Sequence, residues 1–151
     1  MPACTFFGHR DCPDSLKHSL RAVIIDLITN HGVDMFYVGH QGGFDGLVQR
    51  VLSEITQEHP QVHYAVVLAY VPLEGVASGD TSDTMLPEEI ELVHPRYAIS
   101  WRNNWMLQQS DFVVAYVAHS WGGAVQYVQK AIRSGKTVIN LSHSQEGGHA
   151  Q

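Results

Sequence analysis

The segment 119–124, with the sequence HSWGGA, places a serine and a glycine pair between an apolar run and a helical pattern. Two kinds of chemistry use this arrangement. A serine on a sharp turn between a strand and a helix is the nucleophile of α/β-hydrolases, and Ser120 would then be that nucleophile. A Gly-Gly turn at a helix N-terminus holds phosphate through backbone N–H groups, and Gly122 and Gly123 would then have that role.

The order of residues along the chain argues against a serine hydrolase. In those enzymes the acid and the histidine follow the serine, on loops after later strands. After Ser120 the sequence has no Asp, and its one acid, Glu146, lies with His143 and His149 in the last residues. Only one predicted strand follows the serine. We therefore interpret Ser120 as a hydrogen-bond donor to a ligand or as a turn residue.

Strand-like and helix-like segments alternate along the chain. Apolar runs predict strands at 4–8, 35–39, 62–71, 111–117 and 137–141. Helical spacing predicts four helices between them, from Pro13–Asp14 to Gly32, from Phe44 to His59, over 96–110 and over 122–135. Parallel strands need such crossovers, which cover both faces of a sheet. The sequence therefore predicts an α/β fold, a Rossmann-like, doubly wound parallel sheet of about five strands in a single domain.

Ligands of such sheets bind at the carboxyl ends of the strands, near the point where the strand order reverses. Three polar, glycine-rich turns follow predicted strands, at 8–10 (GHR), at 39–46 (GHQGGFDG) and at 119–124. Because the strands are predicted to be parallel, all three turns are expected at the same edge of the sheet.

The predicted domain covers 1–141. Within it, 72–95 has six acidic residues, no Lys or Arg, and many Gly, Ser, Thr and Asp residues. This composition predicts a mobile acidic loop, either a solvated surface segment or a lid over a ligand. The last ten residues, 142–151, have no periodicity and are predicted to be a flexible tail.

Composition and charge exclude several classes of protein. The sequence is 44% hydrophobic, and its apolar runs are far shorter than the roughly 20 residues of a membrane span. With no recognisable leader, we expect a cytoplasmic protein with no membrane partner. The net charge of −6 argues against a nucleic-acid partner. Cys4 and Cys12 are too few for a disulfide framework and are expected to be free thiols.

Taken in order, FFGHR at 6–10, YVGHQGGFDGLV at 37–48, Arg102 and the Gly122–Gly123 pair resemble the SLOG superfamily. This superfamily of Rossmann-like domains includes the LOG phosphoribohydrolases, the DprA/Smf DNA-processing proteins and the small YpsA-like proteins. The resemblance is closest to the YpsA-like branch and covers the chain from Cys4 to about Leu141. It implies a nucleotide or nucleotide-derived ligand (phosphoribosyl or ADP-ribose-like), no required cofactor, and assembly as a homodimer or higher homo-oligomer.

The resemblance also implies which residues contact the ligand. Glycines let backbone amides approach a phosphate, and the planar fork of Arg102 suits bidentate phosphate recognition. Asp45 is interpreted either as an acceptor from ribose hydroxyls or as an acid that stabilises the start of a helix. The candidate ligand-binding residues are Gly8, His9, Arg10, Gly39, Gly42, Gly43, Phe44, Asp45, Arg102, Asn103, His119, Ser120, Trp121, Gly122 and Gly123.

One motif departs from the family pattern. LOG enzymes carry P-G-G-x-G-T-x-x-E, in which the glutamate is needed to cleave the N-glycosidic bond. Here no proline precedes the glycine pair, Ala124 replaces the threonine, and the glutamate position falls on Tyr127 or Gln129. We therefore predict a protein that binds or senses its ligand. The alternative is a nucleoside 5′-monophosphate phosphoribohydrolase in which Asp45 or an acid of 74–91 supplies the carboxylate, with Arg102 as a second catalytic candidate.

A third class of function, a DprA-like single-strand binder, requires a basic groove with stacking aromatic residues. Nine Lys and Arg residues scattered among fifteen acids do not indicate such a groove. This function is the least supported of the three.

Histidine and tryptophan residues leave further alternatives. His9, His40 and His119 all fall in turns at the ligand edge, where they would form a metal or acid/base site, or else bond loops and phosphate. No two of them have the spacing of a local ligand pair, so no metal is predicted. Trp121 would stack on a base, whereas Trp101 and Trp105 share one helix face and indicate a core or a dimer contact.

Overall fold

The computed structural model describes residues 2–70 and 84–142. It contains β1 (Ala3–Gly8), α1 (Leu16–His31), β2 (Met35–Val38), α2 (Gly42–Glu58), β3 (His63–Val67), β4 (Thr84–Met85), the 3-10 helices η1 (Glu88–Leu92) and η2 (Pro95–Tyr97), α3 (Ala98–Gln109), β5 (Phe112–Tyr116), α4 (Gly123–Arg133) and β6 (Thr137–Asn140). Of the helices in this part of the chain, none has the length and apolar character needed to cross a bilayer.

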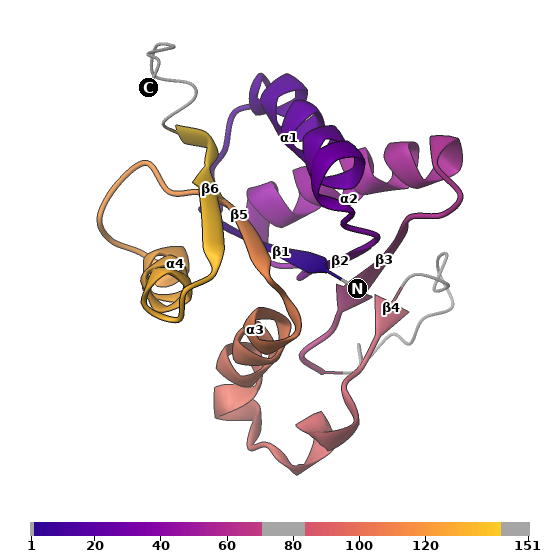
Figure 1. Cartoon of the computed structure of the whole chain (residues 1–151). Coiled ribbons are helices and arrows are strands. Elements are labelled where there is room, and N and C mark those ends of the chain that lie inside the picture. The colour runs from indigo at the N-terminus through magenta and orange to yellow at the C-terminus, as the bar shows by residue number, and fades with distance from the viewer. Residues whose placement is uncertain (1, 71–83, 143–151) are drawn as a thin grey trace.

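The strands form one parallel sheet in the order β4-β3-β2-β1-β5-β6. Helices α1 and α2 cover one face, and α3 and α4 cover the other (Figure 1). The predicted α/β, Rossmann-like doubly wound fold is therefore confirmed. The sheet has six strands where about five were expected, because β4 adds two residues beside β3.

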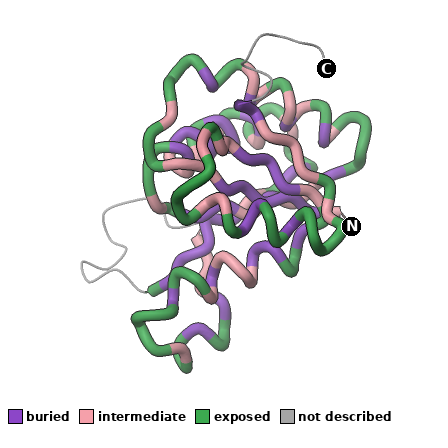
Figure 2. Tube along the Cα trace, turned by 90° about the vertical axis from the view of Figure 1, so that its left-hand side faces the viewer, coloured by how far each residue is buried: buried purple, intermediate pink, exposed green. Residues whose placement is uncertain are grey.

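The two apolar layers follow from alternation along the strands. In β1, Cys4 and Phe6 join the core cluster beneath α1 and α2, whereas Phe7 joins the cluster beneath α3 and α4. The buried residues accordingly follow the middle of the trace, with exposed residues around them (Figure 2). Helix α1 contributes the predicted apolar stripe, and Gly32 ends it with φ of +69°.

Some predicted boundaries were wrong. Helix α1 begins at Leu16 and not at Pro13–Asp14. Strand β3 ends at Val67, although the apolar run continues; the next amide, of Leu68, donates to the Met85 carbonyl oxygen at 2.9 Å. Leu68 and Ala69 are thus buried without extending the strand, whereas Tyr70 is exposed.

The predicted acidic loop and tail are only partly within the described residues. Positions 71–83 and 143–151 lie outside them. The described part of 72–95 is not simply a loop, because it contains β4 and η1, and Ile90 of η1 is buried against Ala98. Ser142, the first residue of the predicted tail, is buried, and its Oγ donates to the Val117 carbonyl oxygen at 2.9 Å.

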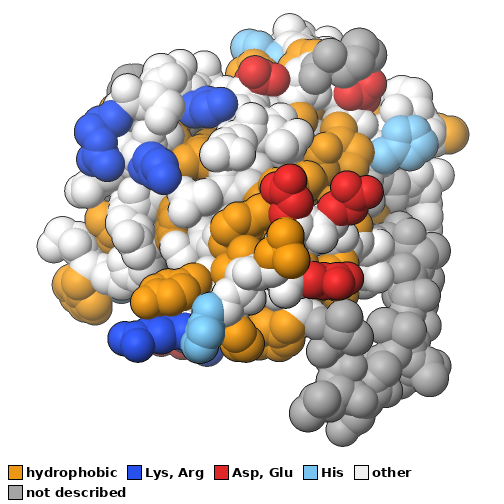
Figure 3. Space-filling view, turned by 90° about the horizontal axis from the view of Figure 1, so that it is seen from below, with side chains coloured by type: hydrophobic (Ala, Val, Ile, Leu, Met, Phe, Trp, Pro, Cys, Tyr) orange, Lys and Arg blue, Asp and Glu red, His pale blue; other side chains and the backbone are white. Residues whose placement is uncertain are grey.

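Charged side chains are grouped by sign on the face shown in Figure 3. Lys and Arg side chains lie toward one side and Asp and Glu side chains toward the other, with exposed hydrophobic side chains between them. Leu92 is the most exposed of the large hydrophobic residues in the described part of the chain, at 87%.

Candidate ligand-binding site

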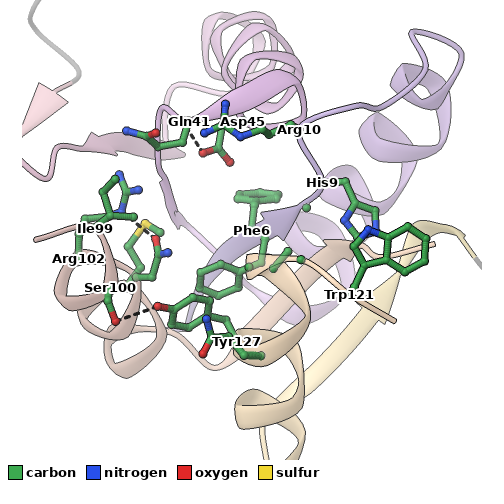
Figure 4. Close-up of a pocket in the computed structure, with 18 of the residues that line it drawn as sticks. Phe6, His9, Arg10, Gln41, Asp45, Ile99, Ser100, Arg102, Trp121 and Tyr127 are labelled. Carbon is green, nitrogen blue, oxygen red and sulfur yellow. Dashed lines mark hydrogen bonds between the residues drawn. The ribbon is translucent and has the colours of Figure 1, made fainter. Parts of the chain in front are cut away.

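A cavity of about 650 Å³ lies at the carboxyl ends of β1 and β5. The strand order reverses between these two strands, and this is where ligands of doubly wound sheets bind. Figure 4 shows Arg102 on one side of the cavity, His9 and Trp121 on the opposite side, and Asp45 between them, beside Gln41 and Arg10. The lining residues are Phe6, Phe7, Gly8, His9, Arg10, Asp11, Gln41, Asp45, Arg96, Ile99, Ser100, Arg102, Asn103, Met106, His119, Trp121, Gly122, Gly123, Ala124, Gln126 and Tyr127.

The N-terminus of α4 forms part of the cavity wall. Gly122 precedes the helix with φ of +109°, a conformation that favours glycine. Apart from its chain neighbours and its own helix, a Cβ atom on Gly123 would have no atom of the described chain within 4 Å, so there is free space beside this residue. The first amides of a helix have no partner within it, and they carry the positive end of its dipole. This wall is therefore suited to an anionic group.

Arg102 of α3 is fixed within the protein and also faces the cavity. Its side chain is buried, with 1% exposed, and it lines the cavity. Nη1 donates to the Val67 carbonyl oxygen and Nε to Oδ1 of Asn103, both at 2.8 Å. Among the described residues Nη2 has no hydrogen-bond partner, which leaves one amine of the guanidinium group for a ligand.

Gly39 makes room for this arginine and does not line the cavity. A Cβ atom at position 39 would lie 2.9 Å from Nη1 of Arg102 and 2.9 Å from Oδ2 of Asp45. Glycine here lets two charged side chains pack against the backbone at the end of β2.

Asp45 stabilises the start of α2, which was one of the two interpretations of this residue. Its Oδ2 accepts a 2.9 Å hydrogen bond from the amide of Gln41, the residue that precedes α2. Burial raises the pKa of the Asp45 carboxyl to about 6, although this amide and the nearby Arg102 favour the charged form. The side chain also lines the cavity, so a role toward a ligand stays open.

Gly42 and Gly43, in the second glycine turn, pack against the first loop and are not among the residues that line the cavity. The amide of Gly43 donates to the Arg10 carbonyl oxygen at 2.8 Å, and a Cβ atom on Gly43 would overlap that oxygen. At Gly42, which has φ of +91°, a Cβ atom would lie 3.1 Å from the Cα atom of Arg10. These glycines hold two loops together, where phosphate contacts were predicted.

Gly8 and Phe44 form another such packing pair. A Cβ atom on Gly8 would overlap the ring of Phe44, which is fully buried in the core. Phe44 is therefore a core residue behind Gly8 and is not among the residues that line the cavity. Ser120 is exposed and lines a separate cavity with Ala118 and Gln129.

The three histidines do not converge. The rings of His9 and His119 are stacked with centroids 3.6 Å apart, whereas His40 lines a different cavity with Gln49 and Arg50. Over 2–70 and 84–142, no group of three or more His, Cys, Asp or Glu side chains is placed to hold a metal ion. Nε2 of His9 accepts from the Ala118 amide at 2.9 Å, and burial, followed by the neighbouring His119, lowers the pKa of His9.

Trp101 and Trp105 pack inside the protein. Trp105 meets the ring of Tyr37 edge-on at 5.4 Å, and Trp101 packs against a small core cluster that includes Ile90 and Ala98. Their shared helix face therefore contributes to core packing, although both residues are partly exposed, and the predicted dimer contact stays a prediction.

Several lining residues were not predicted as site residues, among them Arg96, Ser100 and Tyr127. Helical spacing could have identified Tyr127, because it lies one turn after Gly123 on α4 and so on the same face of the helix. Tyr127 occupies one of the two positions aligned with the expected glutamate, and its hydroxyl donates to Oγ of Ser100 at 3.0 Å. Its ring stacks on Phe7 with centroids 5.3 Å apart.

Comparisons with known proteins support the fold. No protein-family model matches the chain, and no curated protein matches it. Among solved structures, the chain is similar to DNA processing protein A (DprA) from Streptococcus pneumoniae, with a TM-score of 0.62 and 14% sequence identity over 91% of this chain. The match covers 49% of the streptococcal chain, so this chain spans about half the length of that protein. At this identity the likeness is one of fold.

Proposed function

We propose that this cavity binds the phosphate of a nucleotide or a nucleotide-derived compound, such as an ADP-ribose-like or phosphoribosyl ligand, and that the protein binds or senses this ligand without consuming it. One observation carries the proposal: Nη2 of Arg102 and the open N-terminus of α4 at Gly123 belong to the same cavity. A guanidinium group and the first amides of a helix are both phosphate-binding groups.

The charges around the cavity support an anionic ligand. Arg10, Arg96 and Arg102 line it, together with only two acids, Asp11 and Asp45. The chain as a whole has a net charge of −6, whereas basic residues outnumber acidic ones in the lining of the cavity. A locally positive cleft raises the concentration of anions at its walls.

The order of sequence motifs also supports this ligand class. On those motifs, and on a fold similar to that of a DprA protein, we propose that the chain belongs to the SLOG superfamily; its position near the YpsA-like branch is a prediction from the motifs alone. The homodimer that this placement implies stays a prediction, which sedimentation of the purified protein would test.

Thermal unfolding against a ligand panel tests the proposal. The panel contains nucleoside mono-, di- and triphosphates, NAD, ADP-ribose, cyclic nucleotides and ribose 5-phosphate. A ligand that binds the native state raises the unfolding midpoint according to its affinity. We expect at least one phosphorylated member to raise it and to be recovered intact by chromatography.

Gly123→Asp locates the site within the fold. Neither this change nor the control Gly46→Asp would bring a Cβ atom within 4 Å of another group, so both variants should fold. Gly46 lies in α2 and does not line the cavity. We expect Gly123→Asp to abolish the stabilisation through charge repulsion and Gly46→Asp to retain it. Equal stabilisation of both variants would contradict the placement of the phosphate at α4.

A second candidate function is cleavage of the N-glycosidic bond of a nucleoside monophosphate. The observation in its favour is the Asp45 carboxyl, which lines the cavity and whose pKa is raised to about 6, near the range of a general acid or base. Tyr127, held by Phe7 and Ser100, offers no carboxylate at one of the two expected positions. Release of free base during the panel, and its loss in Asp45→Asn, would establish this activity in place of simple binding.

Nucleic acid lies outside the proposal. The similar streptococcal protein is named for DNA processing, but the likeness to it is one of fold. On the face in Figure 3, the basic side chains form small groups and not the continuous groove that a single-strand binder needs. Our prediction that nucleic acid is not the partner is tested by adding single-stranded oligonucleotides to the panel, where stabilisation by them would contradict it.

A further inference from the structure

Three aromatic rings form a continuous stack at the rim of the cavity. His9 and His119 have ring centroids 3.6 Å apart at an interplanar angle of 12°, and His119 and Trp121 have centroids 3.6 Å apart at 17°. His9 comes from the loop after β1, and the other two come from the loop between β5 and α4. The stack therefore joins the two strands between which the strand order reverses.

One end of this stack is anchored to the protein. Nε2 of His9 accepts a 2.9 Å hydrogen bond from the Ala118 amide, which fixes the plane of the His9 ring. Tyr116 meets the same ring edge-on, with centroids 5.9 Å apart at 78°. The position of the stack is thus set by the backbone of the loop and by the end of β5.

The other end of the stack is open. One face of the Trp121 indole is covered by His119, yet the residue is 68% exposed. Trp121 lines the same cavity as Gly123 and is separated from it along the chain by one residue, and Figure 4 shows its ring at the edge of this cavity. An aligned aromatic stack that ends in a free indole face can accept one more planar ring.

We propose that the free face of Trp121 is the subsite for the aromatic base of a nucleotide, whose base becomes the fourth ring of the His9–His119–Trp121 stack. The inference rests on the proposed function, because the phosphate of the same ligand occupies the adjoining N-terminus of α4. The class of ligand is then a nucleoside phosphate and not a sugar phosphate. Stacking on an indole tolerates any base, so the subsite selects for the presence of a base more than for its identity.

A comparison of ligands with and without a base tests this subsite. The probes are the four ribonucleoside 5′-monophosphates and ribose 5-phosphate, which shares their phosphate and sugar, and affinities are measured by titration calorimetry. We expect the wild-type protein to bind the tightest nucleotide more strongly than ribose 5-phosphate by roughly 5- to 150-fold, the range expected for stacking on one aromatic side chain.

Two variants assign this difference to the indole. Trp121→Ala should reduce the ratio of nucleotide to ribose 5-phosphate affinity to near unity, mostly by weakening nucleotide binding. Trp121→Phe should retain much of this ratio, because phenylalanine also stacks on a base. Unfolding midpoints of both variants, measured without ligand, show whether each is folded at the titration temperature. If the alanine variant does not fold, the test uses the wild-type protein and Trp121→Phe, both of which should bind a nucleotide more tightly than ribose 5-phosphate.

The possible outcomes separate this inference from the proposed function. If ribose 5-phosphate binds the wild-type protein as tightly as every nucleotide, the base subsite is wrong and the phosphate site stands. If Trp121→Ala weakens both kinds of ligand equally, Trp121 supports the loop and does not contact a base, and the subsite is again wrong. If no probe binds the wild-type protein, both the proposed function and the base subsite are overturned.

Discussion

Nη1 of Arg102, in α3, donates a 2.8 Å hydrogen bond to the carbonyl oxygen of Val67, at the end of β3. The arginine thereby connects α3, on one face of the sheet, to the carboxyl ends of the strands, where the cavity lies. Because Nη1 and Nε are held by protein groups, the direction of Nη2 is fixed before any ligand arrives. Such preorganisation reduces the entropy lost on binding.

Arg102→Lys tests this dual role. Lysine keeps a positive charge but cannot reproduce the bonds from Nη1 and Nε. We expect a loss of about 1–3 kcal/mol in the free energy of unfolding and a fall in phosphate affinity of about tenfold or more. Denaturant unfolding and calorimetry measure the two effects. The exposed Arg96, changed to Lys, is the matched control and should alter stability by less than about 0.5 kcal/mol. Wild-type affinity in Arg102→Lys would contradict a phosphate contact by this residue.

Alanine substitutions distinguish glycines that pack from the glycine that faces a ligand. At Gly8 and Gly43 a Cβ atom would overlap Phe44 and the Arg10 carbonyl oxygen, respectively. We expect each of these variants to lose about 1–3 kcal/mol of unfolding free energy through overpacking. Gly123→Ala should be neutral or slightly stabilising, because alanine favours a helix and the space there is open. Denaturant midpoints provide the measurement, and equal losses at all three positions would contradict the assignment.

Asp45 gives stability a specific dependence on pH. Its carboxyl has a pKa of about 6 in the folded protein against an ordinary value of 3.8. The folded state therefore holds this proton more tightly than the unfolded chain, and raising the pH from about 4 to about 6 removes stability through this group. We expect Asp45→Asn to gain stability relative to wild type across that window, by up to about 3 kcal/mol, with no further gain at higher pH. Unfolding free energies of both proteins at several pH values give the comparison; a difference independent of pH would show that the carboxyl is not perturbed.

His9 contributes a pH effect of the opposite sign. Burial and the adjacent His119 lower the pKa of His9 below its usual 6.5. As the pH falls below 6.5 the unfolded chain takes up this proton before the folded state does, so stability is lost. We expect His9→Phe, which keeps a ring in the stack but has no titrating group, to lose less stability than wild type on acidification from pH 7.5 to pH 5. Parallel acid dependences in the two proteins would contradict a perturbed His9.

Much of the fold follows from the sequence alone, because local periodicity records which side of a segment is buried. Apolar runs and helical spacing gave the order of strands and helices, and their alternation implied a parallel sheet with ligand-binding turns at one edge. Gly122 and Gly123 were identified as site candidates from the Gly-Gly turn, and Arg102 from the family resemblance; the structure brings all three to the cavity.

Only the tertiary structure decided what the other candidate residues do, because close contacts between distant segments depend on packing. Position 8 requires a glycine because the ring of Phe44, from α2, packs against it. The ring of His9 stacks on that of His119, which lies more than a hundred residues later in the chain. Neither relationship leaves a local pattern in the sequence. The same reason separates His40 from the other two histidines: the end of β2 faces a different cavity from the ends of β1 and β5. A turn motif shows that the backbone can approach a ligand, but the neighbouring elements determine whether a ligand or another loop fills that space.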